Sequence, residues 1–299
     1  MDGRRTPDTG RRTPDDGRRT PRHDNSSSAC RPDELKTIEE TLNRNSQAAS
    51  EWSTCNDMVL NAKKCSSMLF ATRQKMCHAT DDVCMNVQID DDPIPFVTKT
   101  KLLGVHLDNN LTWQDHIKHI HNKIVKNLYL LKQIKDYLSI KDRKLFYNSY
   151  ILPHLDYCSV IWGNCSNYLL IDLLKLQKKA ARLILNRDYT TPSSELFKEL
   201  NWMPVQDRIA YNRSVQVFKC TYGPCPEQLQ NLFTPTSTVH SHLTRSTINN
   251  NLHIGPNHIK SFSHLGAVTW NKLSPTLRES TNSLAFKNKY IKQYFKHFS

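Results

Sequence analysis

The most regular pattern of apolar positions in this 299-residue chain lies between Leu111 and Leu138. Apolar side chains recur there every three or four residues, at Trp113, Ile117, Ile120, Ile124, Leu128, Leu131, Ile134 and Leu138. That spacing places them on one face of an α-helix and leaves the lysines on the remaining surface. Thr112, followed three residues later by Asp115, fits the cap at the start of such a helix. A long amphipathic helix with one buried face is therefore the central expected element.

Two more helices follow it closely. Ser139 and Asp142 predict the start of the first, which continues to an interruption at Pro153. The second extends from Tyr168 to Leu185, and its predicted buried face carries Leu169, Leu173, Leu176, Ala180 and Leu183. Helices of this length with short connections favour an antiparallel bundle.

The segments before the long helix combine one helix with short strands. Apolar spacings of three and four predict a helix over residues 33–50, at Leu35, Ile38 and Leu42. Trp52 is the expected anchor of the segment after it. Short strands are expected at residues 67–70, 83–89 and 102–107, with a turn at residues 90–93.

The segments after the bundle are helical with one polar interruption. Ser193/Ser194 and Pro204 mark two helix starts. A module from Phe262 to Leu273, which contains Trp270, and a helix over residues 283–295 close the chain. The expected fold class is mainly α with a small β element. Its expected segments are a disordered tail (1–32), a strand-containing region (33–110), a helical bundle (111–190), a helical connector (191–233), a loop (234–260) and a C-terminal helical module (261–299).

The first residues form a repeat without apolar side chains. The sequence Gly-Arg-Arg-Thr-Pro begins at Gly3, Gly10 and Gly17. Such a segment has nothing to bury and is expected to be disordered. Its arginine pairs could touch phosphates, but we interpret the segment as a tail without a role of its own.

The charge of the chain favours a polyanionic partner. The formal net charge is +13, and residues 99–187 hold 15 Lys and Arg against 6 Asp and Glu. A basic excess concentrated on helices is typical of proteins that bind nucleic acid. The alternative is a basic surface that only keeps the protein soluble. The apolar content of 38% is low for this length, which indicates that ordered parts alternate with exposed ones.

Cysteine usage and hydropathy bear on the compartment. No run of about 18 apolar residues exists and the N-terminus lacks an apolar core, so neither a membrane span nor a secretory signal is expected. Nine cysteines, an odd number, favour free thiols in a reducing, nuclear or cytoplasmic compartment. The pairs Cys77/Cys84 and Cys220/Cys225 lack the Cys-x-x-Cys spacing, so no zinc site is expected.

Acidic runs and histidines are the remaining candidates for metal chemistry. Asp81-Asp82 and Asp90-Asp91-Asp92 are acidic, but Pro93 directly after the second run suits a turn better than a metal site. His116, His119 and His121 lie on the long helix, and we interpret them as solvated or phosphate-facing rather than metal-binding. No metal or other cofactor is expected.

Several motifs resemble a known family. They are Leu60-Asn61-x-x-Lys64-Cys65-x-x-Met68-x-Phe70, Lys101-x-Leu103-Gly104-Val105-x-Leu107-Asp108, Leu111-x-Trp113, Ile151-Leu152-Pro153-His154-Leu155-Asp156-Tyr157 and Phe262-Ser263-x-x-Gly266-Ala267-x-x-Trp270-Asn271. In order and spacing they resemble LINE-type (non-LTR retrotransposon) reverse transcriptases of the jockey and CR1 kind, over roughly residues 51–297.

The resemblance implies an architecture and a binding role. It implies a two- to three-stranded palm remnant, a primer-grip-like hairpin at Leu103, Gly104 and Val105, and a thumb-like helical bundle. Thumb helices lie along a primer–template duplex. The basic residues expected to contact the phosphates of RNA or an RNA/DNA duplex, weakly and without sequence preference, are Lys123, Lys126, Lys178, Lys179 and Arg182.

The chain departs from the family pattern in its acidic residues. The family holds two metal ions on an early palm Asp and an aromatic-x-Asp-Asp motif, which precede the motif at Asn61. Residues 1–50 contain no such motif. We therefore expect no catalytic residue, and a catalytically incomplete protein that is not an enzyme.

A second resemblance concerns the helical segment alone. Residues 112–150 resemble a short helical region at the N-terminus of AlkB-homologue tRNA-modifying proteins, which join a 2-oxoglutarate/iron oxygenase to a methyltransferase. The oxygenase needs a His-x-Asp with a distant His, and the methyltransferase needs a glycine-rich loop after a strand. The chain has eight glycines and none in such a cluster, so neither domain is expected.

Two other interpretations are kept beside nucleic-acid binding. The first is a host-adopted helical module that binds a protein partner through an exposed former palm interface, marked by Trp52, Phe70 or Tyr157. The second is a relic reading frame without function.

Overall fold

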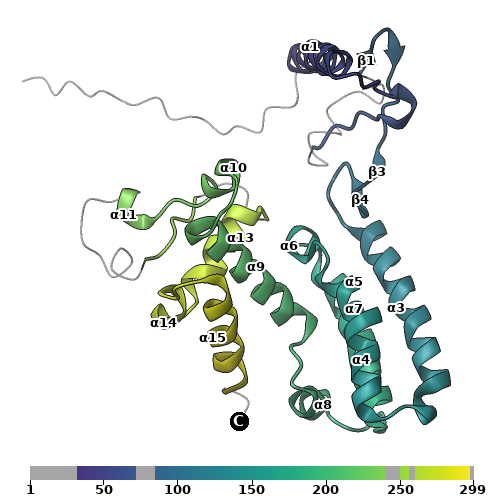
Figure 1. The fold of residues 1–299 in the computed structure, drawn as a ribbon, viewed down its shortest axis with the longest axis vertical. Coiled ribbons are helices and arrows are strands. Elements are labelled where there is room, and N and C mark those ends of the chain that lie inside the picture. The colour runs from purple at the N-terminus through teal and green to yellow at the C-terminus, as the bar shows by residue number, and fades with distance from the viewer. Residues whose placement is uncertain (1–31, 72–84, 240–249, 256–259, 297–299) are drawn as a thin grey trace, which may run out of the picture. The chain divides into compact units, whose positions relative to one another are not determined.

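The computed structural model of the protein describes residues 32–71, 85–239, 250–255 and 260–296 (Figure 1). The chain divides into two compact units, residues 1–67 with 71–96, and residues 68–70 with 97–299. The predicted disordered tail lies outside the described residues. The described part is mainly helical with two small two-stranded sheets, so the predicted fold class is confirmed.

The first unit packs one long helix against a small hairpin. Helix α1 (Pro32–Cys55) is longer than predicted, and a short 3-10 turn, η1 (Ala62–Lys64), follows it. Strands β1 (Gln88–Ile89) and β2 (Asp92–Pro93) pair antiparallel. The carboxylate of Asp90 accepts a hydrogen bond from the Ser50 hydroxyl. Trp52 was predicted to anchor this region by burial, but its side chain is 61% exposed, so that prediction is wrong.

The other strand predictions need correction as well. Residues 67–70 contribute only an isolated bridge between Ser67 and Phe96 rather than a strand. Of residues 83–89, only Gln88–Ile89 form a strand, and residues 83 and 84 lie outside the described part. The predicted turn at residues 90–93 is found in the β1–β2 hairpin, where Asp90 and Asp91 adopt φ of 47° and 69°. Short apolar runs carry too little periodicity to distinguish a strand from extended coil.

A hairpin lies where the apolar pattern predicted a single strand at residues 102–107 and where the family resemblance implied a hairpin. Strands β3 (Lys99–Leu102) and β4 (Val105–Asp108) pair antiparallel, with Leu102 opposite Val105. The two residues between them, Leu103 and Gly104, have φ of 46° and 85°. Two successive residues with positive φ form the turn that best matches the twist of a two-stranded hairpin. Gly104 supplies the conformation that other residues adopt only under strain.

Asp108 joins this hairpin to the long helix α3 (Gln114–Ile134). Its carboxylate accepts hydrogen bonds from the backbone N–H groups of Asn110 at 3.1 Å, Thr112 at 3.0 Å and Trp113 at 3.2 Å, and from the Thr112 hydroxyl at 3.0 Å. Trp113 occupies the N-cap position, one residue after the predicted Thr112, and the Thr112 hydroxyl accepts a hydrogen bond from the Gln114 N–H at 3.5 Å. Asp108 therefore holds the turn that leads into α3, including the N–H of Trp113, which a helix start leaves open.

Replacing Asp108 with alanine should destabilise the protein by about 2–4 kcal/mol, because three backbone donors lose a charged acceptor. Urea unfolding followed by circular dichroism measures the effect. The matched control is Asp136→Ala, whose carboxylate is exposed and lies 3.6 Å from Lys135. That control should change stability by less than about 1 kcal/mol. Equal effects of the two variants would contradict the role of Asp108 in holding the turn before α3.

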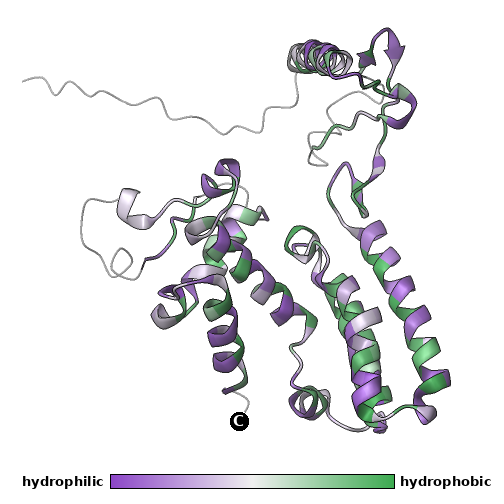
Figure 2. Ribbon diagram, in the orientation of Figure 1, coloured by the Kyte–Doolittle hydropathy of each residue, from purple (hydrophilic) through white to green (hydrophobic). Residues whose placement is uncertain are grey.

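Three helices form the predicted antiparallel bundle. Helices α3, α4 (Ile140–Tyr150) and α7 (Asn167–Leu185) contact one another (Figure 1). Figure 2 shows hydrophobic and hydrophilic residues interspersed along α3. Leu131, Tyr147 and Leu173 are buried in the core that the three helices share. The 3-10 turn η2 (Lys135–Tyr137) and the short helices α5 (Leu152–Asp156) and α6 (Ser159–Trp162) connect them. The predicted α3 stripe is buried at Trp113, Ile117, Ile120, Ile124, Leu128 and Leu131.

The start of α4 and the end of α7 follow the sequence signals. The Ser139 hydroxyl accepts from the Asp142 N–H at 3.2 Å, as predicted. Helix α7 ends at Asn186 in the left-handed conformation, which favours asparagine or glycine. Leu173, Leu176 and Ala180 of its predicted face are buried. The edges of that face differ from the prediction, because Leu170 and Ile184 are buried while Leu169 and Leu183 are half-buried. A continuous apolar run makes the exact face of a buried helix ambiguous.

A second hydrophobic core lies farther along the chain. Helix α9 (Val205–Tyr222) contributes to both cores. The remaining helices are α8 (Ser193–Leu200), α10 (Glu227–Gln230), α11 (Thr236–Val239), α13 (Phe262–Asn271), α14 (Pro275–Arg278) and α15 (Ser283–Lys296). Trp270 and Phe286 are fully buried in the second core. The predicted loop at residues 234–260 includes α11, and its residues 240–249 and 256–259 lie outside the described part.

A polar network fixes α9 to the connection between α4 and α7. The Arg208 guanidinium donates to both carboxylate oxygens of Asp156, at 2.6 and 2.7 Å. Asn212 donates to Asp156 at 3.1 Å and to the Ser159 hydroxyl at 3.0 Å. This bidentate pair is only about 30% exposed, so it defines how α5 and α9 pack.

Among the described residues, no helix is both long and apolar enough to cross a membrane.

Candidate nucleic-acid interface

The predicted primer-grip residues form the tip of the β3–β4 hairpin. Leu103 is 82% exposed, whereas Val105 is buried in the bundle core. The Tyr157 hydroxyl donates to the Leu103 carbonyl at 2.5 Å, and its ring lies beside Gly104. The turn is therefore held in place by the Tyr157 side chain, and it exposes the apolar side chain of Leu103 to solvent.

His116 links the hairpin to α3. It was predicted to be solvated or phosphate-facing, but it is buried. The backbone N–H of His106 donates to its Nδ1 at 3.3 Å, so the proton of the neutral ring must lie on Nε2. Its ring is buried beside that of Trp162, with 6.0 Å between centroids. Burial and the neighbouring His106 and His119 lower the pKa of His116 to about 4, so the ring is neutral near pH 7.

Four groups that carry or can carry positive charge act on His119, and with it we call them the cationic cluster: Lys101 of β3, His106 of β4, His119 and Lys123 of α3, and His154 of α5. The His106 and His119 rings lie 4.7 Å apart. Burial, followed by His106, Lys123, Lys101 and His154, holds the pKa of His119 below its ordinary value. Burial and then Lys123 lower the pKa of His154. The helix and the hairpin therefore bring like charges together.

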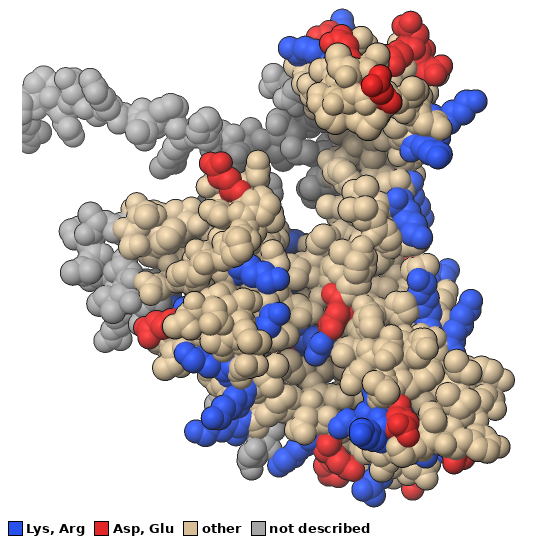
Figure 3. Space-filling view, viewed as in Figure 1, with Lys and Arg blue, Asp and Glu red and all other residues tan. Residues whose placement is uncertain are grey.

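The cluster has little negative charge around it. The nearby Asp115 carboxylate, on which His106 acts, is bound to Lys99 at 2.7 Å. Within the described part of the chain, no member of the cluster forms an ion pair. Figure 3 shows basic side chains along the edge formed by β3 and the first half of α3. Grouped cations without counter-charges favour an anion between them.

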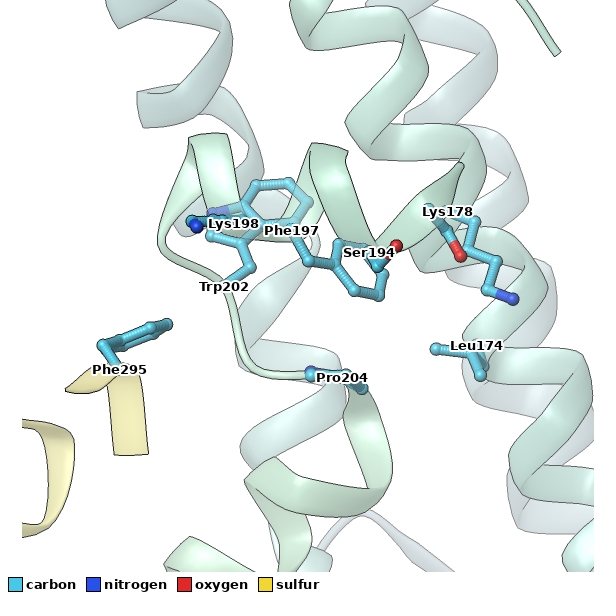
Figure 4. Close-up of a pocket in the computed structure, with 9 residues that line it drawn as sticks. Leu174, Lys178, Ser194, Phe197, Lys198, Trp202, Pro204 and Phe295 are labelled. Carbon is cyan, nitrogen blue, oxygen red and sulfur yellow. The ribbon is translucent and has the colours of Figure 1, made fainter. Parts of the chain in front are cut away.

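The five basic residues predicted to contact phosphates lie in different surroundings. Lys123 belongs to the cationic cluster, and Lys126 is exposed one turn farther along α3. Lys179 is exposed on α7, and Lys178 lines a hollow near Trp202 (Figure 4). Arg182 is bonded to the loop after α7: its Nη2 donates to the carbonyls of Tyr189 and Thr191 at 3.2 and 3.3 Å. Its guanidinium also lies 5.0 Å from the centre of the Tyr189 ring.

The acidic and metal candidates do not assemble into a site. Asp81-Asp82 lie outside the described residues, and Asp90 to Asp92 form the β1–β2 turn. Across the described ranges, no group of three or more His, Cys, Asp or Glu is placed to hold a metal ion. The Cys220 and Cys225 sulfurs are 3.5 Å apart as free thiols. The three markers of a protein partner, Trp52, Phe70 and Tyr157, are each at least half exposed.

Sequence reasoning missed part of the cationic cluster. Lys101, His106 and His154 stand inside quoted motifs, but nothing in their spacing relates them to His119. The signal that could have found them is the hairpin itself: Lys101 is opposite His106 in its register. A two-residue turn at Leu103-Gly104 would have predicted that pairing.

Comparison with known proteins places the chain beside RNA-directed DNA polymerases of transposons. It is 26% identical over 186 residues to a protein of Drosophila melanogaster named a probable RNA-directed DNA polymerase from transposon X-element. It is 25% identical over 188 residues to the RNA-directed DNA polymerase from mobile element jockey of Drosophila funebris, and 24% identical over 176 residues to that of D. melanogaster. The predicted resemblance to LINE-type reverse transcriptases is confirmed.

The matches cover 58–62% of this chain and 18–19% of each relative, so the chain spans about a fifth of their length. The expectation that the chain is not an enzyme is corrected, because the relatives are named as polymerases, which are enzymes. No protein-family model matches, and the AlkB-homologue resemblance gains no support. No solved structure matches.

Proposed function

We propose that the helical part of this reverse-transcriptase-related chain binds the sugar–phosphate backbone of RNA or an RNA/DNA duplex without sequence preference. The cationic cluster carries the proposal. It gathers Lys101, His106, His119, Lys123 and His154 from four elements, and no described carboxylate pairs with any of them.

The surroundings of the cluster support backbone binding rather than base recognition. The cluster adjoins the Leu103-Gly104 turn, whose Leu103 side chain is exposed beside the positive charge. Lysines and protonated imidazoles donate charge-assisted hydrogen bonds to phosphate oxygens, which every nucleotide presents alike. Backbone contacts of this kind make affinity fall steeply as salt rises.

A titration of a short RNA/DNA duplex with the full chain, across salt and pH, tests the proposal. Affinity should be measurable at about 50 mM salt and decrease linearly on a log–log plot as salt rises. A phosphate beside His119 and His154 favours their protonated forms and raises the lowered pKa values of the free protein. Binding then takes up protons, so affinity should increase as the pH falls from about 8 to about 6, by at most about tenfold per pH unit for each proton.

The control for this titration is the double variant His119→Gln/His154→Gln, which should bind with an affinity that changes little with pH. Stability must be followed in parallel. The unfolded chain protonates His116 near pH 6.5, but the folded chain does so only near pH 4. Folding is therefore weakened progressively as the pH falls from about 6.5 to about 4. Absence of binding at about 50 mM salt, with the protein folded, contradicts the proposal.

A further inference from the structure

Two cysteines meet where helix α9 ends. Cys220 lies in the last turn of α9, and Cys225 lies in the connection to α10. Their Sγ atoms are 3.5 Å apart, and both residues are free thiols. A disulfide needs an S–S distance of about 2.05 Å, so the two sulfurs must approach each other by about 1.5 Å. Small rotations about the two Cα–Cβ bonds supply a movement of that size.

The chain between the two cysteines is held at both ends. Helix α9 ends at Tyr222, and the N–H of Gly223 donates to the Lys219 carbonyl at 3.0 Å. A Cβ on Gly223 would lie 3.0 Å from that carbonyl oxygen, so the absence of a side chain lets the chain turn closely over the helix end. On the other side, Gln230 of α10 donates to the Cys225 carbonyl at 2.7 Å. These contacts keep the two thiols next to each other in the folded protein.

The two thiols differ in their access to solvent. Cys220 is 2% exposed and belongs to the second hydrophobic core, whereas Cys225 is half-buried at the edge of that core. Burial, followed by the neighbouring Cys225, raises the pKa of the Cys220 thiol to about 11, so this thiol is protonated near pH 7. A thiol reagent in solution therefore reaches Cys225 first, and Cys220 reacts with a sulfur that is already beside it.

We propose that Cys220 and Cys225 form a redox-active dithiol, which a low-molecular-weight disulfide such as oxidised glutathione converts into an intramolecular disulfide. Cys225 loses its proton and attacks one sulfur of the small disulfide, whose S–S bond breaks, and the first small thiolate leaves and takes up a proton. Cys220 then loses its proton and attacks the Cys225 sulfur, which breaks the mixed disulfide and releases the second small thiol. Both cysteines are oxidised, and the small disulfide is reduced to two thiols.

Peptide mapping after treatment with oxidised glutathione tests the proposal. The folded, reduced full chain is treated, its remaining thiols are blocked with iodoacetamide, and trypsin is added without reductant. Residues 220–245 form one tryptic peptide, because Lys219 precedes it and Arg245 ends it, and Cys220 and Cys225 are its only cysteines. This peptide should be lighter than its reduced form by two hydrogen atoms, with neither glutathione nor an alkyl group attached.

Cys55 provides the matched control in the same digest. It is exposed, and it is the only cysteine of the tryptic peptide that covers residues 45–63. No sulfur of another described cysteine is in contact with it, so it should accumulate as a mixed disulfide with glutathione. If the peptide of residues 220–245 carries glutathione to the same extent as the Cys55 peptide, the proposal is overturned.

Two variants test the order of the steps. Cys220→Ala removes the second thiol, so Cys225 should retain one glutathione. Cys225→Ala removes the accessible thiol, and Cys220 should then take up glutathione at least about tenfold more slowly than Cys225 does in the first variant. Equal rates would overturn the assigned order. If a variant fails to fold, the reduced natural chain decides the order, because iodoacetamide should alkylate Cys225 at least about tenfold faster than Cys220.

The new bond should also change the stability of the protein. It closes the loop from Cys220 to Cys225 and joins the end of α9 to the chain that leads into α10. Fewer conformations are then open to the unfolded chain, so the unfolding constant of the oxidised form should be lower by about tenfold. Urea unfolding of both forms, followed by circular dichroism, measures this. A higher unfolding constant in the oxidised form means that the native fold does not accommodate the disulfide, which overturns the proposal.

Discussion

The double variant Lys101→Ala/Lys123→Ala should bind a short RNA/DNA duplex about 10- to 100-fold more weakly than the natural chain at about 50 mM salt. The two lysines come from β3 and α3 and act on the same histidine, His119. Each phosphate contact that is lost should also reduce the slope of log affinity against log salt by about one. Fluorescence anisotropy across a salt series measures both quantities.

The control for this experiment removes the same net charge elsewhere. Lys141 is exposed on α4, and Lys175 is exposed on α7, where it lies 2.9 Å from Asp172. Lys141→Ala/Lys175→Ala should reduce affinity only slightly. If both double variants weaken binding equally, the net charge of the chain binds the duplex and the cationic cluster has no special role.

The variant Arg208→Ala should lower the free energy of unfolding by about 2–4 kcal/mol. Removing the guanidinium leaves the largely buried carboxylate of Asp156 with Asn212 as its remaining donor. Breaking one side of a buried pair costs about 3–5 kcal/mol, and the partial exposure of this pair reduces that value. Urea unfolding measures it. The exposed pair Lys175–Asp172 is the control, and Lys175→Ala should cost less than about 1 kcal/mol.

A further variant distinguishes the charge from the packing. The double variant Arg208→Met/Asp156→Leu removes both charges and keeps apolar volume, so it should be more stable than Arg208→Ala. If the double variant is less stable than Arg208→Ala, the network acts through shape and the hydrogen bonds of Asn212 rather than through an unpaired charge.

Local signals along the sequence were sufficient for most helices. The stripe from Trp113 to Leu131 is buried as predicted, because a helical period repeats over about five turns and depends on nothing outside the segment. Ser139 caps α4 for the same reason, since its partner Asp142 is three residues away. The predicted resemblance to reverse transcriptases was confirmed, because it rests on the order of several motifs along the chain.

Strands and helix faces were less predictable. Residues 67–70 and 83–89 were expected to form strands, but short apolar runs fit several conformations. The N-cap of α3 was predicted at Thr112, whereas the helix has Trp113 in that position and the turn before it is held by Asp108 of the hairpin. A side chain that holds a helix entry from another element leaves no fixed spacing for a sequence pattern to detect.

The sequence by itself therefore determined that this chain is a basic, mainly helical protein with a reverse-transcriptase-like order of motifs. Only the tertiary structure decided that Lys101, His106, His119, Lys123 and His154 share one neighbourhood. The physical reason is that amphipathic periodicity fixes which face of a helix is buried. The position of one element against another follows from packing and hydrogen bonds between residues far apart in sequence.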